Sequence, residues 1–562
     1  MNKNTKPIII LGTISVLVFV LIFAGITITK NWGKSKQTIS TENAEALLNN
    51  ILKDITVNKV EARKDSVNLN DTSLADSLPS IDKSPVQVEN KTSDFIEIFS
   101  SPEKAGSETD GWLVDVANDF NKSNITVNGK AVSVKIRSIS SGMGMDYIVS
   151  KKYLPDAFTP SNELWGEMMI SKGAKVTLAD KSLVGNVPGI VLSKKKNDEL
   201  VKKYGSISLK VVIEAVVNNE LSMGYTNPLQ SSTGLNFLVS ALSAFDSKNP
   251  LSDTAKAEFE KFQANIPFVS YTTLQMRDAA ASGVLDGMIL EYQTYANSPD
   301  IKSSYVFTPF GYRHDNPIYQ IGDLSQEKKA ILNKFIEFCK QEKAQSLASK
   351  YGFNQLNDYK SEIGQVTGDT ITQAQAIWKE KKNGNKDIIA VFVADRSGSM
   401  DGAPLNKLKE SLLKGSQYIS KDSSIGLVTY SDDVDINLPI AKFDINQRSL
   451  FTGAVKDITA GGGTSTFDAV MVATKMLLEQ KASNPDAKLM LFVLSDGVTN
   501  RGHSLKDIEG ILQTFKIPVY TIGYNANIDA LQSLSGINEA ASINADSEDV
   551  IYKLQNLFNA EM

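Results

Sequence analysis

The chain has 562 residues, of which 42% are hydrophobic and 22% are charged. This length exceeds a single ordinary core, so we expect two to four domains. With 59 basic and 64 acidic residues the net charge is −5, which gives no indication of nucleic-acid binding. The single cysteine, Cys339, cannot form an internal disulfide or a cysteine-rich metal site, and two distant histidines do not suggest a zinc cluster.

The first feature along the chain is a charge-free apolar stretch, Ile8–Thr29. At about 1.5 Å per helical residue it would extend about 33 Å, enough to span a bilayer. It is longer than the apolar part of a cleaved signal peptide, and no convincing cleavage site follows it. We therefore expect residues 1–30 to form an uncleaved signal-anchor transmembrane helix. Lysines flank both ends almost equally, and we prefer a single-pass protein with its bulk outside the cell membrane.

Residues 31–93 are rich in Ser, Asn, Asp, Thr and Lys. One stretch, "AEALLNNILKDI", is consistent with a short helix, whereas "LPSIDKSPVQVENKTSD" has the composition of an extended linker. We expect this segment to be a stalk that separates the folded domains from the membrane.

Strand-like and helix-like segments alternate from residue 94 to residue 368. Examples are the strand pattern "DFIEIFSS", the helical stripe in "GWLVDVANDFNKS" and the alternating strand "VSVKIRSIS". The alternation predicts an α/β domain with mainly parallel sheets.

A more regular alternation occupies residues 386–562, after the helical segment "TQAQAIWKEKK". Strands are expected at "IIAVFVA", "SIGLVTY", "KLMLFVLS" and "PVYTIGY", with helices between them and a closing helix "VIYKLQNLFNA". This pattern predicts a doubly wound, Rossmann-like α/β domain.

Oxygen-bearing side chains follow two of these strands. Asp395, Ser397 and Ser399 come after "IIAVFVA", and Asp496 comes after "KLMLFVLS". Thr464 lies in "AGGGTSTFDAV", on a glycine-rich turn that opens a helix. Because ligands of open parallel sheets bind at the carboxyl ends of strands, these residues are candidate ligands of a hard cation such as Mg²⁺.

The three motifs, in this order, resemble the metal-ion-dependent adhesion site (MIDAS) of von Willebrand factor A domains. The resemblance implies that Ser397, Ser399 and Thr464 coordinate the metal, and that Asp395 and Asp496 act directly or through water. It implies Mg²⁺ as the ion, with Mn²⁺ and Ca²⁺ as alternatives. It also implies a protein partner that offers an acidic side chain to the metal.

No catalytic grouping accompanies these motifs. The sequence contains no G-x-S-x-G motif, and "AGGGTST" lacks the G-K-[ST] ending of a phosphate loop. Arg501 and His503 are interpreted as ordinary surface residues near the rim. We therefore predict that the chain is not an enzyme.

Residues 94–368 resemble type 2 periplasmic solute-binding proteins in segment order, in the turn "NPLQSSTGLNFL" and in the helical "KFIEFCKQEKAQSLASKYGF". Hydroxyl-bearing turns before helices suit a solute, because helix amino termini carry unpaired N–H groups. The resemblance implies solute contacts from Ser101, Ser141 and Ser232, and Glu291 is a further candidate near the hinge. The sequence does not identify the solute.

The combined interpretation is a membrane-anchored extracellular binding protein with a solute-binding-like domain and a Mg²⁺-dependent, adhesion-type domain. Two alternatives stay open. The chain could be the solute receptor of a transport system, or a non-catalytic subunit of an ATPase or chelatase-type complex. The absence of a Walker motif means that the second alternative requires a separate ATPase.

Overall fold

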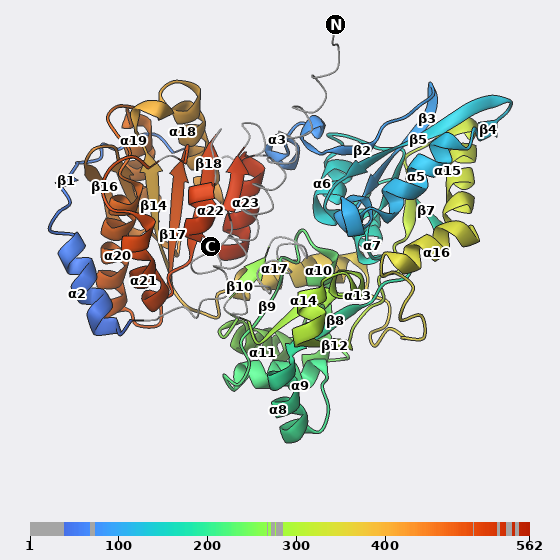
Figure 1. The fold of residues 1–562 in the computed structure, drawn as a ribbon, viewed down its shortest axis with the longest axis horizontal. Helices are drawn as coiled ribbons and strands as arrows, with labels where there is room; N and C mark the ends of the chain where they lie inside the picture. The colour runs from blue at the N-terminus through green and yellow to red at the C-terminus, as the bar shows by residue number, and fades with distance from the viewer. Residues whose placement is uncertain are drawn as a thin grey trace, which may run out of the picture.

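The computed structural model describes residues 39–67, 73–266, 268–270, 276, 285–497, 499–524, 529–535, 542–545 and 550–562. They form a C-terminal domain and a two-lobed middle domain (Figure 1). The expected membrane segment, Ile8–Thr29, lies outside the described residues. Among the helices that are described, none has the length and apolar character needed to cross a bilayer.

The C-terminal domain is a 7-stranded sheet in the order β1-β16-β15-β14-β17-β18-β19. Its strands are β1 (Val57–Lys59), β14 (Ile388–Asp395), β15 (Ser424–Tyr430), β16 (Val434–Lys442), β17 (Lys488–Ser495), β18 (Val519–Tyr524) and β19 (Ser542–Ala545). Its helices are α2 (Thr41–Ile51), α18 (Ala403–Gly415), α19 (Ile445–Asp457), α20 (Thr466–Ser483), α21 (Leu505–Phe515), α22 (Asp529–Ser535) and α23 (Val550–Glu561). The only antiparallel pair among these strands, β15–β16, includes a strand that the sequence patterns did not predict.

β14 occupies the centre of this sheet because it is apolar from Ile388 to Ala394 and both of its faces are buried. Ala390 and Phe392 pack in one hydrophobic cluster with residues of α18, α19 and α23. Val391 and Val393 pack in the opposite cluster with residues of α2, α20 and α21. A strand buried on both faces holds its carboxyl end in a fixed position, and Asp395 stands at that end.

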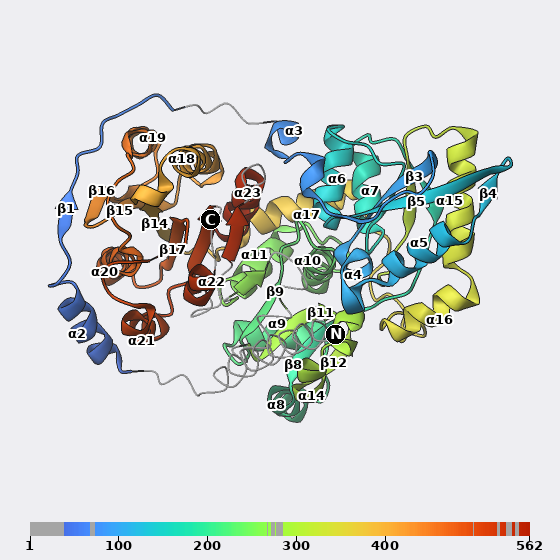
Figure 2. The same cartoon turned by 45° about the horizontal axis from the view of Figure 1, so that its top comes forward.

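The segment predicted to be a stalk contributes to the C-terminal domain. α2 contacts α20 and α21, and β1 pairs in parallel with β16 and forms one edge of the sheet (Figure 2). The helix predicted from "AEALLNNILKDI" is therefore present, but it is docked. Residues 39–67 do not behave as an extended spacer, because Leu48 and Ile51 bury their side chains in the core of the C-terminal domain.

Lobe 1 of the middle domain comprises residues 73–180 and 318–354. Its sheet has the order β2-β5-β3-β6-β13-β7, with β4 paired to β5. The strands are β2 (Val86–Val88), β3 (Asp94–Ser100), β4 (Thr126–Val127), β5 (Lys130–Ser138), β6 (Ala157–Thr159), β7 (Val176–Asp180) and β13 (Ile318–Ile321). The helices are α3 (Leu74–Ser77), α4 (Pro102–Ala105), α5 (Trp112–Lys122), α6 (Ser141–Ser150), α7 (Leu164–Ser171), α15 (Gln326–Cys339) and α16 (Glu342–Lys350).

Lobe 2 comprises residues 188–309 and has a 5-stranded sheet in the order β10-β9-β11-β8-β12. The strands are β8 (Pro188–Ser193), β9 (Met223–Thr226), β10 (Phe268–Ser270), β11 (Gly287–Glu291) and β12 (Tyr305–Pro309). The helices are α8 (Lys194–Tyr204), α9 (Leu209–Val217), α10 (Ser232–Phe245), α11 (Asp253–Gln263), α13 (Tyr292–Ala296) and α14 (Pro299–Ser304). Both middle sheets are mixed rather than mainly parallel, because β8 and β13 run antiparallel to their neighbours.

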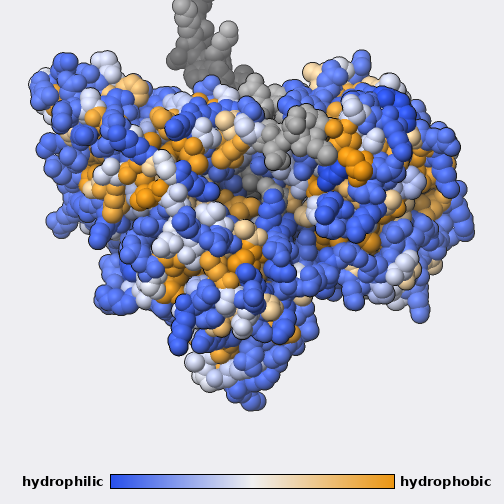
Figure 3. Space-filling view, turned by 180° about the vertical axis from the view of Figure 1, so that it is seen from behind, coloured by the Kyte–Doolittle hydropathy of each residue, from blue (hydrophilic) through white to orange (hydrophobic). Residues whose placement is uncertain are grey.

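The chain crosses between the lobes twice, after β7 and after β12. The two crossings form a bridge at Asn186 and His314, whose backbone N–H groups each donate to the other residue's carbonyl. This pair of crossings is the hinge of the middle domain. The face of the molecule seen in Figure 3 is mostly hydrophilic, with hydrophobic residues in separate groups.

α17 (Gly368–Lys381) connects the middle domain to the C-terminal domain. Ile371 packs in a cluster with lobe 1 residues, whereas Trp378 packs in the core of lobe 2 and donates its indole N–H to Tyr225 at 2.6 Å. The helix thus contacts both lobes before the chain enters β14.

Two neighbouring leucines of α2 provide a direct test of whether this helix is docked on the C-terminal domain. Leu48 is 2% exposed and Leu47 is 46% exposed. We expect Leu48→Ala to destabilise the C-terminal domain by about 2–4 kcal/mol, because a cavity opens in its core. Leu47→Ala should change stability by less than about 0.5 kcal/mol. Hydrogen exchange of the β14 amides in denaturant series measures both values, and equal effects would show that α2 is a detached linker.

Candidate metal centre and interlobe cleft

The first candidate site lies at the carboxyl edge of the C-terminal sheet. β14 and β17 pair in parallel with Ala394 opposite Leu494, so both strands end at the same level. Asp395 is the last residue of β14, and Asp496 directly follows β17. The sheet geometry therefore places side by side the two loops that were predicted from separate sequence motifs.

Backbone hydrogen bonds join these loops to the glycine-rich turn. Gly398 donates its N–H to the Gly462 carbonyl at 3.0 Å, and Gly461 donates to the Arg396 carbonyl at 2.8 Å. Gly462 has a φ of 82°, a left-handed conformation that favours glycine. On the other side, the Thr464 N–H donates to Asn500 Oδ1 at 2.9 Å. Thr464 is thus held between the loops that carry Ser397 and Asp496.

Asp395 is fully buried and is held from two sides. Its Oδ1 accepts a hydrogen bond from the Ser397 N–H at 2.8 Å, and its Oδ2 accepts one from the Ser495 hydroxyl at 2.6 Å. Burial raises the pKa of the Asp395 carboxyl and the charge of Asp496 adds to this, while the hydrogen bonds from Ser397 and Ser495 oppose it. A nearby cation would favour the ionised carboxylate.

The oxygen atoms at this edge fit a hard divalent cation. The hydroxyls of Ser397 and Ser399 lie 3.0 Å apart. Asp496 Oδ1 is buried and has no hydrogen-bond partner within the described part of the chain. Such an orphaned carboxylate oxygen is costly unless something else binds it. No group of three or more His, Cys, Asp or Glu residues suited to a metal occurs among the described residues, so any metal here must use hydroxyl oxygens as well.

Two ion pairs form the rim of this edge. Arg501 Nε contacts Asp432 Oδ1 at 2.6 Å, and the Arg501 side chain is 62% exposed. His503 Nδ1 lies 2.7 Å from Asp468 Oδ1. Sequence patterns did not single out Asp432, although "SDD" directly follows β15, the strand beside β14. Arg501 is thus a rim residue with an acidic partner.

The second candidate site lies between the lobes of the middle domain. Ser232 begins α10 in lobe 2, and Ser141 begins α6 in lobe 1. The Ser232 hydroxyl accepts a hydrogen bond from Trp165 Nε1 at 2.8 Å and donates one to the Ser141 hydroxyl at 3.1 Å. Two residues predicted independently therefore meet at the contact between the lobes, and their role toward a solute stays a prediction.

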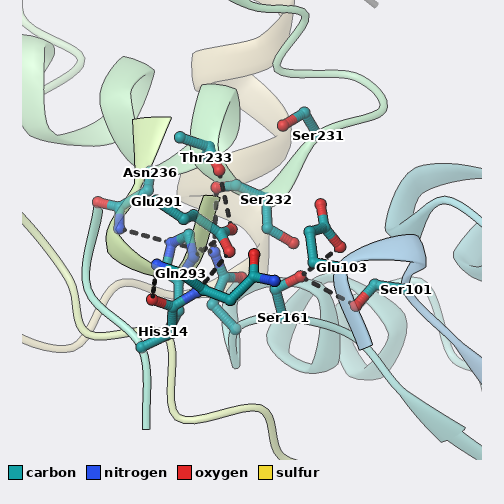
Figure 4. A network of polar contacts seen from close by, with 12 residues as sticks. Ser101, Glu103, Ser161, Ser231, Ser232, Thr233, Asn236, Glu291, Gln293 and His314 are labelled. Carbon is teal, nitrogen blue, oxygen red and sulfur yellow. Dashed lines mark hydrogen bonds and ion pairs between the residues drawn. The ribbon is translucent and has the colours of Figure 1, made fainter. Parts of the chain in front are cut away.

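Ser101 lies in the lobe 1 part of the same region. Its hydroxyl accepts a hydrogen bond from the Ser161 hydroxyl at 3.1 Å (Figure 4). It accepts a second one from Lys104 Nζ at 2.6 Å. Lys104 is fully buried, and burial lowers the pKa of its ammonium. Burial raises the pKa of neighbouring Glu103, and the charge of Glu291 adds to that rise.

Glu291 ends β11 beneath the cleft and is satisfied entirely by protein groups. Asn186 Nδ2 donates to its Oε2 at 2.7 Å, and the Thr233 hydroxyl donates to its Oε1 at 2.9 Å. His314 Nδ1 contacts the same Oε1 at 2.8 Å. The predicted position near the hinge is therefore observed, but the carboxylate already has its partners.

The orientation of the Asn236 amide determines which ring nitrogen of His314 carries the proton. The Asn236 amide is oriented by Tyr312, because Oδ1 accepts the Tyr312 N–H at 3.0 Å and Nδ2 donates to the Tyr312 carbonyl at 2.6 Å. The same Nδ2 lies 2.9 Å from His314 Nε2, which must then accept. His314 Nδ1 is consequently the donor to Glu291. Sequence reasoning missed this residue, although His314 is one of two histidines in the chain.

Two family models match separate parts of the chain. Residues 390–560 match the model of the von Willebrand factor type A domain, and residues 105–354 match that of a bacterial extracellular solute-binding protein. Both resemblances inferred from the sequence are confirmed. The chain thus has a solute-binding-like region at residues 105–354 and a von Willebrand factor type A-like region at residues 390–560.

Individual relatives share only parts of the chain. Inter-alpha-trypsin inhibitor heavy chain H3 of Bos taurus is 30% identical over 150 residues, which is 25% of this chain and 16% of that protein. The von Willebrand factor type A structure from Catenulispora acidiphila is 17% identical and covers 31% of this chain and 42% of its own, with a TM-score of 0.28. The sulfate-binding protein SubI from Mycobacterium tuberculosis H37Rv is 15% identical and covers 47% and 88%, with a TM-score of 0.35.

The two histidines provide a matched test of the buried cluster. His314→Ala removes a donor from the buried Glu291, and we expect a loss of about 3–5 kcal/mol in middle-domain stability. His503→Ala breaks a similar pair at the partly open rim and should cost about 1 kcal/mol. Tryptophan fluorescence during urea unfolding measures the loss in His314→Ala, since Trp112, Trp165 and Trp378 lie in the middle domain or α17. Hydrogen exchange of the β14 amides measures the loss in His503→Ala, since His503 lies in the C-terminal domain. Equal losses would contradict the assignment of His314 as a buried partner.

Proposed function

We propose that the chain is a non-enzymatic, membrane-anchored extracellular binding protein whose C-terminal domain binds a protein partner through Mg²⁺. Its domains directly support a binding or adhesion-type protein, because both matched families are binding or adhesion-type domains. The metal, the partner and the anchor are the parts that we infer.

The observation that carries the metal proposal is the orphaned oxygen of Asp496 beside the paired hydroxyls of Ser397 and Ser399. With Asp395 and Thr464, these residues supply two carboxylates and three hydroxyls. A bound Mg²⁺ would supply a positive charge that accepts further oxygen ligands. Two carboxylates do not exceed its charge, so an acidic side chain from a partner completes the set.

The chain's own groups at this edge favour binding over catalysis. The Ser397 hydroxyl contacts the Ser399 hydroxyl, and the Asp395 carboxylate accepts from Ser495 and from a backbone N–H. None of these contacts, in the part of the chain that is described, pairs a hydroxyl with a histidine base. His503 is engaged with Asp468 instead.

For the middle domain we propose a small polar solute between the lobes. The hydroxyls of Ser101, Ser141 and Ser232 lie at the lobe contact, and Asn162 Oδ1 is buried there without a hydrogen-bond partner in the described structure. A solute with both donor and acceptor groups suits this lining. Glu291 takes no part, because its oxygens are occupied by Asn186, Thr233 and His314.

The position of Ile39 fits a membrane anchor at the edge opposite the metal site. α21 begins at Leu505, after the Asp496 loop, and ends at Phe515 at the other edge of the sheet. Near that end, the Thr514 hydroxyl donates to the Ile39 carbonyl at 3.2 Å. An anchor preceding Ile39 would hold the C-terminal domain by this edge and direct Asp395 away from the membrane.

The metal proposal is tested by calorimetric Mg²⁺ titration of the full chain in detergent. Asp395→Ala removes one of two carboxylates and should weaken Mg²⁺ binding at least about tenfold, or about 1.4 kcal/mol. Ser399→Ala should weaken it less, since a neutral ligand is lost. The control is Asp457→Ala, which removes an exposed carboxylate of the same domain that pairs with Arg63. Unchanged affinity in Asp395→Ala, with native circular dichroism, would contradict the proposal.

The anchor proposal is tested by protease treatment of intact cells. With residues 8–29 in the membrane and the amino terminus inside, protease should degrade the folded domains without cell lysis. Protection in intact cells followed by digestion after lysis would show the opposite orientation. Recovery of the whole chain in the medium would show that residues 8–29 do not anchor it.

A further inference from the structure

Tyr552 projects from the C-terminal domain into the contact between the lobes. It belongs to α23, yet its ring packs in a cluster of lobe 1, lobe 2 and α17 residues that includes Met145, Trp165, Leu235 and Ile371. The residue is 1% exposed. Tyr552 of the C-terminal domain is therefore part of the core of the middle domain.

The Tyr552 hydroxyl links the two lobes by hydrogen bonds. Gln230 Nε2, in lobe 2, donates to Tyr552 Oη at 3.0 Å. Tyr552 Oη donates to Asp146 Oδ2, on α6 of lobe 1, also at 3.0 Å. Burial raises the pKa of the Asp146 carboxyl, and the hydrogen bond from Tyr552 opposes that rise. Without the hydroxyl, Asp146 would lose a donor in a poorly hydrated position.

Gln230 is itself one of the residues through which the lobes touch. Its carbonyl accepts the Gly142 N–H at 3.1 Å, and its Oε1 accepts the Ser140 hydroxyl at 3.1 Å. The approach is so close that a Cβ at position 142 would lie 2.3 Å from the Leu229 carbonyl oxygen. Ser141 and Ser232, whose hydroxyls are also in contact, lie one residue before Gly142 and two residues after Gln230.

We propose that Tyr552 is a positioning residue of the interlobe cleft, supplied by the C-terminal domain, that holds the two lobes in their closed arrangement. This rests on the proposed function of the middle domain, which requires the lobes to separate for a solute to enter. Tyr552 orients Gln230 toward lobe 1 and holds Asp146, so that the cleft is completed only when the C-terminal domain is docked.

The rest of α23 explains how Tyr552 is kept in place. Leu554 and Phe558 pack in the core of the C-terminal domain with Phe392 of β14. The Phe558 carbonyl accepts a hydrogen bond from Lys382 Nζ at 3.3 Å, at the end of α17. Tyr552 is therefore fixed to the C-terminal core and cannot follow one lobe when it moves away from the other.

The test is hydrogen exchange of the full chain, read at the amide of residue 142, which donates across the cleft. Tyr552→Phe keeps the ring and removes the hydroxyl. Loss of one such hydrogen bond should increase the open population, and hence the exchange rate, about fivefold. Tyr351→Phe is the matched control, because the Tyr351 hydroxyl also donates to an aspartate, Asp115, but within lobe 1. Exchange in Tyr351→Phe should equal that of the unmodified chain.

Gly142→Ala separates this proposal from the proposed function. The added methyl collides with the Leu229 carbonyl and should force the lobes apart, so residue 142 should exchange fastest in this variant. Fast exchange in Gly142→Ala with no change in Tyr552→Phe would overturn the role of Tyr552 while leaving lobe opening intact. Slow exchange in both would show that the lobes do not separate, and both proposals would fail.

Discussion

The pairing of β1 with β16 is the constraint on which the arrangement of the domains depends. It makes residues 57–59 and residues 388–545 members of one sheet, so the middle domain is inserted into the C-terminal domain and attached to it at two places. Because both ends of the middle domain are attached to this sheet, α17 must cross the two lobes to reach β14, and α23 is brought against the lobes.

The parts of the structure that follow from local sequence were predictable, and those set by distant partners were not. "IIAVFVA" can only be a buried strand in such a domain, and the hydroxyls and carboxylates of the three loops are recognised by their order alone. β1 is three exposed residues without an apolar pattern, and its pairing partner lies more than 370 residues away. The roles of His314 and Tyr552 could not be predicted from the neighbouring sequence either, because each depends on side chains in other elements.

Glu291 and Asp496, one at each candidate site, differ in the hydrogen bonding of their buried carboxylate oxygens. Glu291 accepts hydrogen bonds from three side chains, so its charge is compensated within the protein and stabilises the hinge. Asp496 retains a buried oxygen with no partner within the described residues. A fold tolerates such an atom where an external group binds it, since an unsatisfied buried acceptor is otherwise destabilising. This contrast is the physical reason for treating the sheet edge as a binding site and Glu291 as a structural residue.

The closed lobes also constrain how a solute could bind. Contacts between Ser141 and Ser232, between Gly142 and Gln230, and through Tyr552 hold the lobes together without any solute. A solute that enters only an open cleft has its apparent affinity reduced by the fraction of molecules that are open. Each protein contact that closes the cleft lowers that fraction, and one of these contacts belongs to the C-terminal domain. Anything that moved α23 away from the lobes would therefore shift the population toward the open form without changing any residue that touches the solute.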